Sequence, residues 1–151
     1  AGCKLWTREG WQELINWLVD QGYSVYNVSK ERNQFDKCVQ IEDTTMDNTI
    51  NVIWNSQFFI GLSSGLSWLA WAIGVPVVMI SNFTEDDHEF ECIRVTNKNV
   101  CHGCWNNKNF KFDKGDYNWC PIWKGYDKQF ECHTSITAGY VINHISPLIH
   151  T

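Results

Sequence analysis

Residues 58–80, with the sequence FFIGLSSGLSWLAWAIGVPVVMI, form the stretch that decides the fold. An apolar run at 58–62 has the length of a strand, and the small residues at 63–65 end it. Apolar residues continue over 66–73, the length of a short helix, and a second apolar run follows at 75–80. Continuous apolar runs of strand length are typical of parallel strands buried on both faces. The stretch therefore predicts a strand, a helix and a second strand.

The sequence before this stretch shows the same alternation. Apolar residues recur at intervals of three and four between Thr7 and Gly22, which predicts an amphipathic helix with Thr7 as N-cap and Gly22 just after its end. Residues 23–29 and 38–41 are β-rich and predict two short strands, and 47–56 predicts a second helix. Helices alternating with short strands predict an α/β fold, with a Rossmann-like parallel sheet and flanking helices.

The composition changes after this sheet region. Residues 82–131 are polar, aromatic and rich in cysteine, and helical periodicity returns only at 134–145. A chain of 151 residues is the usual size of one domain. We therefore expect one domain over residues 1–151, with an insertion at about 92–133 and a closing helix at about 134–147.

Charge and hydropathy exclude some classes of function. The chain has 12 Lys and Arg against 17 Asp and Glu, for a net charge of −5, and it contains no basic run. Nucleic-acid binding is therefore not expected. Small and turn-forming residues interrupt the longest apolar stretch, so no membrane span is expected. The chain begins without Met or an apolar leader, which favours a fragment of a longer protein.

The small residues at 63–65 stand where a ligand would meet the backbone. The first N–H groups of the helix predicted to begin there are unpaired and aligned with its dipole. Such a helix start binds anions, and a diphosphate fits it. Ligands of open α/β sheets lie beyond the carboxyl ends of the strands, where this turn is expected. The structural alternative is that Ser63 caps the helix and Gly65 permits close packing.

Four of the seven cysteines gather late in the chain, at Cys101, Cys104, Cys120 and Cys132. The two-residue gap of the first pair lets two thiolates face one ion, Gly103 relieves the tight turn, and the other two cysteines complete a tetrahedral shell. Thiolate ligands favour zinc, with iron as the main competitor. Two disulfides or four unbound thiols are the alternatives. Either His102 or His133 is placed to replace one cysteine.

Other single residues carry weaker signals. Glu42 and Asp43 follow the strand predicted at 38–41, where they would either accept ribose hydroxyls or cap the next helix. Three cysteines are scattered beside apolar segments and are expected to be buried thiols: Cys3, Cys38 and Cys92. Four tryptophans have helical spacing and are expected in the core: Trp11, Trp17, Trp54 and Trp71.

Residues 59–78, FIGLSSGLSWLAWAIGVPVV, resemble the donor-binding segment of heptosyltransferases with two Rossmann-like domains. That segment runs from a strand to a small residue, a glycine, a helix and then Gly-x-Pro-Val-Val. Together with the late four-cysteine finger, the chain resembles the bacterial autotransporter O-heptosyltransferases over nearly its whole length.

The resemblance implies one half of a GT-B-type transferase that moves heptose from an ADP-heptose donor to serines of an autotransporter passenger protein in the bacterial cytoplasm. Ser63, Ser64 and Gly65 would meet the donor diphosphate, with Leu66 and Ser67 adding backbone donors. Glu42, which follows the strand predicted at 38–41, is expected to accept a ribose hydroxyl of the same donor. The resemblance also implies one iron ion at the four cysteines, with zinc as the alternative.

Two departures from the related lipopolysaccharide heptosyltransferases limit this transfer of roles. Those enzymes have an acidic residue and a His where this chain has Ser63 and Trp68, so their sugar contacts are not carried over. The resemblance also implies that the N-terminal half of the family, which binds the acceptor and supplies the proposed catalytic base, is not part of this sequence. We therefore expect no catalytic residue in this fragment and no activity from it alone. The alternative function is a metal-knuckle protein-interaction module on an α/β scaffold that binds no nucleotide.

Overall fold

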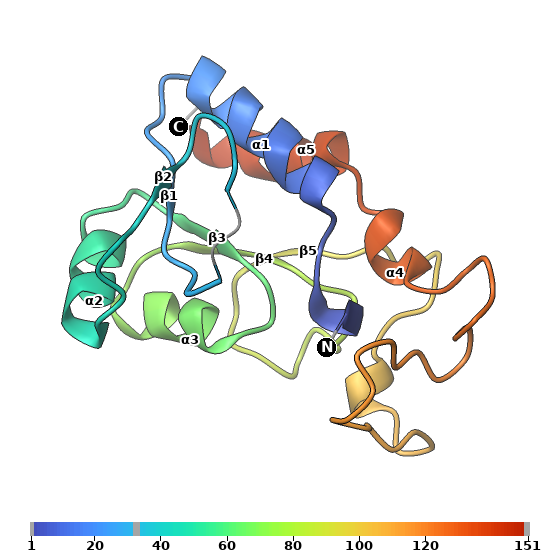
Figure 1. Cartoon of the computed structure of the whole chain (residues 1–151). Coiled ribbons are helices and arrows are strands. Elements are labelled where there is room, and N and C mark those ends of the chain that lie inside the picture. Colours follow the sequence, from blue (N-terminus) through green and yellow to red (C-terminus); the bar gives the residue numbers. More distant parts are fainter. Residues whose placement is uncertain (1, 32–33, 150–151) are drawn as a thin grey trace.

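The computed structural model describes residues 2–31 and 34–149, in which helices and parallel strands alternate (Figure 1). The first half contains η1 (Gly2–Lys4), α1 (Arg8–Asp20), β1 (Tyr26–Asn27), β2 (Val39–Gln40), α2 (Met46–Trp54) and β3 (Phe59–Gly61). The second half contains α3 (Gly65–Ala72), β4 (Val77–Ile80), β5 (Ile93–Val95), η2 (Cys104–Asn106), α4 (Glu131–Thr134) and α5 (Ala138–Ile149).

All the strand pairs in the described part of the chain are parallel, which confirms the predicted α/β class. β1 pairs with β2, and a second sheet has the order β3-β4-β5. Strand β5 was not predicted, because its three residues lie among the polar residues that we assigned to the segment after β4. The carboxyl ends of β3, β4 and β5 face the same edge, which places the segments that follow them together.

Strand β4 is the centre of the fold. All four of its residues are buried, and successive side chains point to opposite faces. Val78 and Ile80 pack in one apolar cluster with residues of α1 and α5, whereas Val77 and Met79 pack in another with residues of α2 and α3. Figure 1 shows the two helix pairs on opposite sides of the strands. Each fully buried side chain of this kind contributes about 1.5–3 kcal/mol.

Strand β3 differs from the expectation of burial on both faces. Gly61 is buried, but Phe59 and Ile60 are only half-buried. The physical reason is position: β3 lies at the edge of the three-stranded sheet, and β4 takes the central place. Trp54 and Trp71 were also expected in the core, but they are 65% and 49% exposed on the outer surfaces of α2 and α3.

Helix ends follow the predicted signals. The Thr7 side chain accepts a hydrogen bond from the Gly10 N–H at 3.0 Å, so Thr7 is the N-cap of α1. Gly22 and Gly74 follow α1 and α3 with φ of 94° and 84°, a left-handed conformation that favours glycine. The helix predicted at about 134–147 corresponds to α5, which begins at Ala138 and ends at Ile149, and the short helix α4 before it was not predicted. No helix of the described residues is long and apolar enough to cross a bilayer.

Residues 96–130 contain little regular structure and pack, together with Cys3 and Phe83, around a third, largely aromatic cluster. Cys3, Phe83 and Trp119 form its buried part, and partly buried side chains surround them: Cys104, Phe110, Phe112 and Phe130. Phe112 and Trp119 meet edge to face with ring centroids 5.1 Å apart. Figure 1 shows this part of the chain beside α4, at one end of the sheet.

Candidate functional site

The turn between β3 and α3 places backbone donors at an open surface. Ser64, not Ser63, is the N-cap of α3; it has extended backbone angles and makes no side-chain cap hydrogen bond. Ser63 is half-buried, whereas Ser64 and Gly65 are exposed. The first N–H groups of α3 therefore lack the side-chain acceptor that an N-cap usually supplies. The arrangement suits an anion, and the capping role expected of Ser63 is not observed.

Gly65 is not required by the packing of the chain. A Cβ added there would meet no atom within 4 Å, and the residue is not in the left-handed region. The missing side chain leaves the space beside the helix start open. Gly61 differs, since a Cβ there would lie 2.5 Å from Phe59 Cε1 and 2.8 Å from Ser67 Oγ. Gly61 is thus required by the packing of the fold, whereas Gly65 is not.

Ser67 has a structural role in the same turn. Its side chain is fully buried, and its hydroxyl donates to the Leu62 carbonyl at 2.6 Å. This bond ties the first turn of α3 to the end of β3. Leu66 is half-buried beside it. The Ser67 hydroxyl is therefore used within the fold, and the prediction that Leu66 and Ser67 meet a ligand concerns their backbone N–H groups.

Glu42 and Asp43 follow β2, and both are exposed. Asp43 Oδ1 accepts the Thr45 N–H at 3.0 Å, and this hydrogen bond is the main reason that the pKa of Asp43 lies below its usual value. The Asn48 side chain donates to the Asp43 carbonyl at 2.7 Å. Thr45 is the N-cap of α2. Asp43 thus supports the turn that leads into α2, and Thr45 rather than Asp43 is the cap of that helix.

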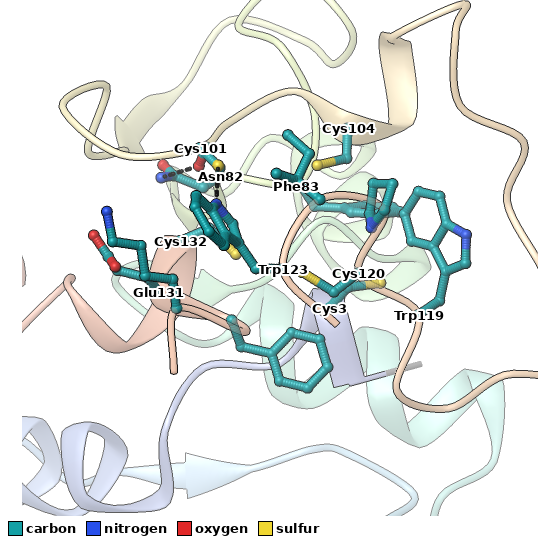
Figure 2. A pocket seen from close by; sticks show the side chains of 14 residues that line it. Cys3, Asn82, Phe83, Cys101, Cys104, Trp119, Cys120, Trp123, Glu131 and Cys132 are labelled. Carbon is teal, nitrogen blue, oxygen red and sulfur yellow. Dashed lines mark hydrogen bonds between the residues drawn. The ribbon is translucent and has the colours of Figure 1, made fainter. Parts of the chain in front are cut away.

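The four late cysteines line one pocket, although 31 positions separate the first from the last in the sequence. Figure 2 shows Cys101, Cys104, Cys120 and Cys132 around this pocket, beside Trp119 and Trp123. Among the described residues, no group of three or more His, Cys, Asp or Glu side chains is placed to hold a metal ion. The predicted metal finger is therefore observed only as a shared pocket. All seven cysteines, each within the described ranges, are free thiols.

The donor chemistry of the pocket fits a soft cation. Burial, and then repulsion from neighbouring thiolates, raises the pKa of Cys132 to about 12 and that of Cys104 to about 11. Without a compensating positive charge these thiols stay protonated at neutral pH. A divalent ion reverses this balance because it binds thiolates and releases their protons.

Neither predicted histidine replacement lines this pocket in the described structure, but a fifth cysteine does. His102 Nδ1 lies 3.2 Å from Glu85 Oε1. His133 is buried behind Cys132, and burial lowers its pKa to about 4. Of the three cysteines expected to be buried, Cys3 is buried, but Cys38 and Cys92 are only partly buried. Cys3 lies in the pocket with the late cysteines (Figure 2). Because Cys3 is far from the late cysteines in the sequence, its place in this pocket was not predicted.

Asn82 joins the first cysteine pair to the sheet and was missed in the sequence. It lies just after β4, is 1% exposed, and its side chain exchanges two hydrogen bonds with the Asn97 backbone, at 2.7 and 2.8 Å. The same side chain donates to the Cys101 carbonyl at 3.2 Å, and the Asn82 carbonyl accepts the Gly103 N–H at 2.7 Å. Gly103 has φ of 73°, which confirms its predicted role in the turn. The available signal was a polar residue directly after a buried strand.

Comparisons with known proteins agree with this architecture. The model of Glycosyltransferase family 9 (heptosyltransferase) matches residues 2–119. Autotransporter heptosyltransferase Aah from Escherichia coli is 40% identical over 98% of this chain and 41% of Aah. The inactive autotransporter heptosyltransferase BimC from Burkholderia thailandensis is 36% identical over 86% of this chain and 33% of BimC.

Solved structures give the same result. The crystal structure of the iron-containing dodecameric glycosyltransferase TibC from enterotoxigenic E. coli H10407 is 35% identical, with a TM-score of 0.90 over 99% of this chain and 43% of TibC. TibC in complex with ADP-D-beta-D-heptose is similar, at 34% identity and a TM-score of 0.89 over 99% of this chain and 42% of that one. This chain thus spans about two fifths of the relatives it matches. By these matches the chain belongs to glycosyltransferase family 9, the heptosyltransferase family, and within it to the autotransporter heptosyltransferases.

Proposed function

We propose that this chain is the donor-binding half of a GT-B-type autotransporter heptosyltransferase, with ADP-heptose as its donor. The observation that carries the proposal is the turn between β3 and α3, where the start of α3 has no side-chain cap and Gly65 leaves open space. The diphosphate would accept hydrogen bonds from backbone N–H groups at 63–67, and the helix dipole would favour its charge. Glu42 is proposed to accept a ribose hydroxyl at the end of β2.

The proposed chemistry is the transfer of heptose to a serine hydroxyl. The bond between the anomeric carbon and the β-phosphate oxygen breaks, and its electron pair stays on the departing ADP. The serine oxygen forms the new bond and loses its proton to a base outside this chain. Backbone N–H groups at the turn stabilise the charge that develops on ADP. The autotransporter passenger protein would bind through the other domain, in the bacterial cytoplasm.

The four cysteines, Cys101, Cys104, Cys120 and Cys132, are proposed to hold one iron ion, with zinc as the alternative. Their shared pocket and soft donor atoms support this site, and the TibC relative is described as iron-containing. A bound ion would supply a cross-link between segments that have little secondary structure. Its proposed role is therefore structural.

Calorimetric titration with ADP tests the donor site, using Gly65→Glu and Gly65→Gln. The packing tolerates a side chain at position 65, and a carboxylate at a helix start favours the helix. The same carboxylate repels a diphosphate. We expect Gly65→Glu to bind ADP about tenfold or more weakly than Gly65→Gln does. A tenfold difference in affinity corresponds to ~1.4 kcal/mol of binding free energy. Both variants should unfold at or above the temperature of the unmodified protein.

Equal ADP affinity in the two variants would contradict binding at this turn. No heat with millimolar ADP or ADP-heptose in the unmodified protein would favour the interaction-module alternative. The similarity to BimC, described as inactive, makes this titration the deciding measurement.

A further inference from the structure

We propose that Trp123 and His133 donate ring N–H groups to the sulfurs of Cys101 and Cys132 and thereby tune the metal ion held there. This inference rests on the proposed four-cysteine site. It assigns a function to two side chains that are not ligands and that the donor site does not use.

The Trp123 contact is direct. Its Nε1 donates to Cys101 Sγ at 3.3 Å, and Figure 2 shows this bond across the pocket. An indole nitrogen can only donate, so the direction of the bond is fixed. Lys128 Nζ lies 5.1 Å from the centroid of the indole, and Tyr126 meets the indole edge to face. These contacts hold the ring, and the nearby cation makes its N–H a stronger donor.

The His133 contact involves a second sulfur of the pocket, that of Cys132. His133 is 1% exposed, and its Nδ1 lies 3.6 Å from Cys132 Sγ. Its other ring nitrogen, Nε2, is buried without a hydrogen-bond partner among the described residues. A neutral imidazole has one N–H, and a thiolate at Cys132 is the acceptor within reach. The proton is therefore placed on Nδ1 when Cys132 binds a metal ion.

A hydrogen bond to a ligand sulfur changes the metal because it withdraws charge from the thiolate. The oxidised ion, with its higher positive charge, loses more stabilisation from this than the reduced ion does. Each N–H···S bond therefore raises the reduction potential of bound iron. It also moves the thiolate-to-metal charge-transfer band to higher energy for any ion that has such a band.

The experiment measures both properties in the purified protein, loaded with iron for the potential and with Co²⁺ for the absorption band. Trp123→Phe keeps an aromatic ring at this position and removes the N–H donor, so the midpoint potential should fall and the band should move to lower energy. Trp119→Phe is the matched control, because Trp119 lines the same pocket but its Nε1 donates to the Lys111 carbonyl at 3.2 Å. This control should leave potential and band unchanged.

The second arm uses His133→Leu and His133→Asn. Leucine removes the donor, whereas the amide of asparagine returns an N–H near the place of Nδ1. We expect His133→Leu to shift both readouts in the same direction as Trp123→Phe, and His133→Asn to reverse part of that shift. If Trp123→Phe does not bind metal, the comparison of His133→Leu with His133→Asn tests the inference by the same two readouts.

Unchanged potential and band in Trp123→Phe and His133→Leu, with metal bound, would overturn the inference and leave the metal site intact. A protein that takes up neither iron nor Co²⁺ would overturn both the metal site and this inference. The donor-site proposal is independent of both results, since ADP titration tests it.

Discussion

Two glycines flank the turn between β3 and α3, and a methyl group would act differently at each. At Gly61 it would collide with the Phe59 ring and with Ser67 Oγ, at 2.5 and 2.8 Å. Ser67 Oγ is the group that ties α3 to the Leu62 carbonyl. At Gly65 a methyl group would enter open space. The packing of the fold therefore depends on Gly61, whereas the ligand access that we propose at this turn depends on Gly65, four positions later.

Gly61→Ala is expected to destabilise the protein by about 1–3 kcal/mol, because the buried strand end has no room for the methyl group. Denaturant unfolding of Gly61→Ala and Gly65→Ala measures the difference. Gly65→Ala should be as stable as the unmodified protein, since alanine favours a helix more than glycine does. Equal unfolding midpoints for the two variants would show that the turn relaxes around residue 61.

At the scale of elements, α1 illustrates which parts of the fold the sequence could predict. Its apolar spacing, its N-cap Thr7 and the left-handed Gly22 are local signals, and the structure has all three. Strand β5 carries no comparable signal, because its three residues depend on pairing with β4. β1 and β2 are two residues each, shorter than their β-rich stretches. Local signals therefore predicted long helices well and short strands poorly.

The cap of α1 gives a prediction for that element. Thr7→Ala removes the acceptor of the Gly10 N–H and should lower the free energy of unfolding by about 1 kcal/mol. Thr7→Ser keeps an acceptor and should cost less than half of that. Helix α1 packs on α5 within the larger apolar cluster, so global chemical unfolding reports the change. A Thr7→Ala protein as stable as Thr7→Ser would mean that packing alone fixes the start of α1.

At the scale of the whole molecule, the sheet and the cysteine-bearing segment are stabilised by different means. Two apolar clusters cover the two faces of β4, whereas residues 101–132 surround a small aromatic cluster and a pocket of thiols. Cysteine spacing predicted four of the five cysteines that line this pocket. It could not predict Cys3 or Asn82, because both reach the pocket through the tertiary fold. Asn82 joins the two parts through its bonds to Asn97, Cys101 and Gly103.

Removal of the proposed metal ion should therefore loosen one part of the molecule and leave the other folded. Treatment with a chelator, or Cys104→Ser, removes the proposed cross-link from residues 101–132, which have few backbone hydrogen bonds of regular structure. Hydrogen exchange there should become faster, while amides of β4, buried between two helical layers, should keep their protection. Cys38→Ser is the matched control, because Cys38 lies outside the pocket.

Metal retention should also fall as pH falls, because each thiolate ligand must lose a proton and burial favours its protonated form. The expected direction follows from the raised pKa values of Cys104 and Cys132, which make protons strong competitors for these two sulfurs. Elemental analysis after dialysis across a pH series measures the retention, and exchange at 101–132 should become faster over the same pH range. If β4 lost protection together with residues 101–132, the two parts would be one cooperative unit, and the metal would stabilise the whole domain.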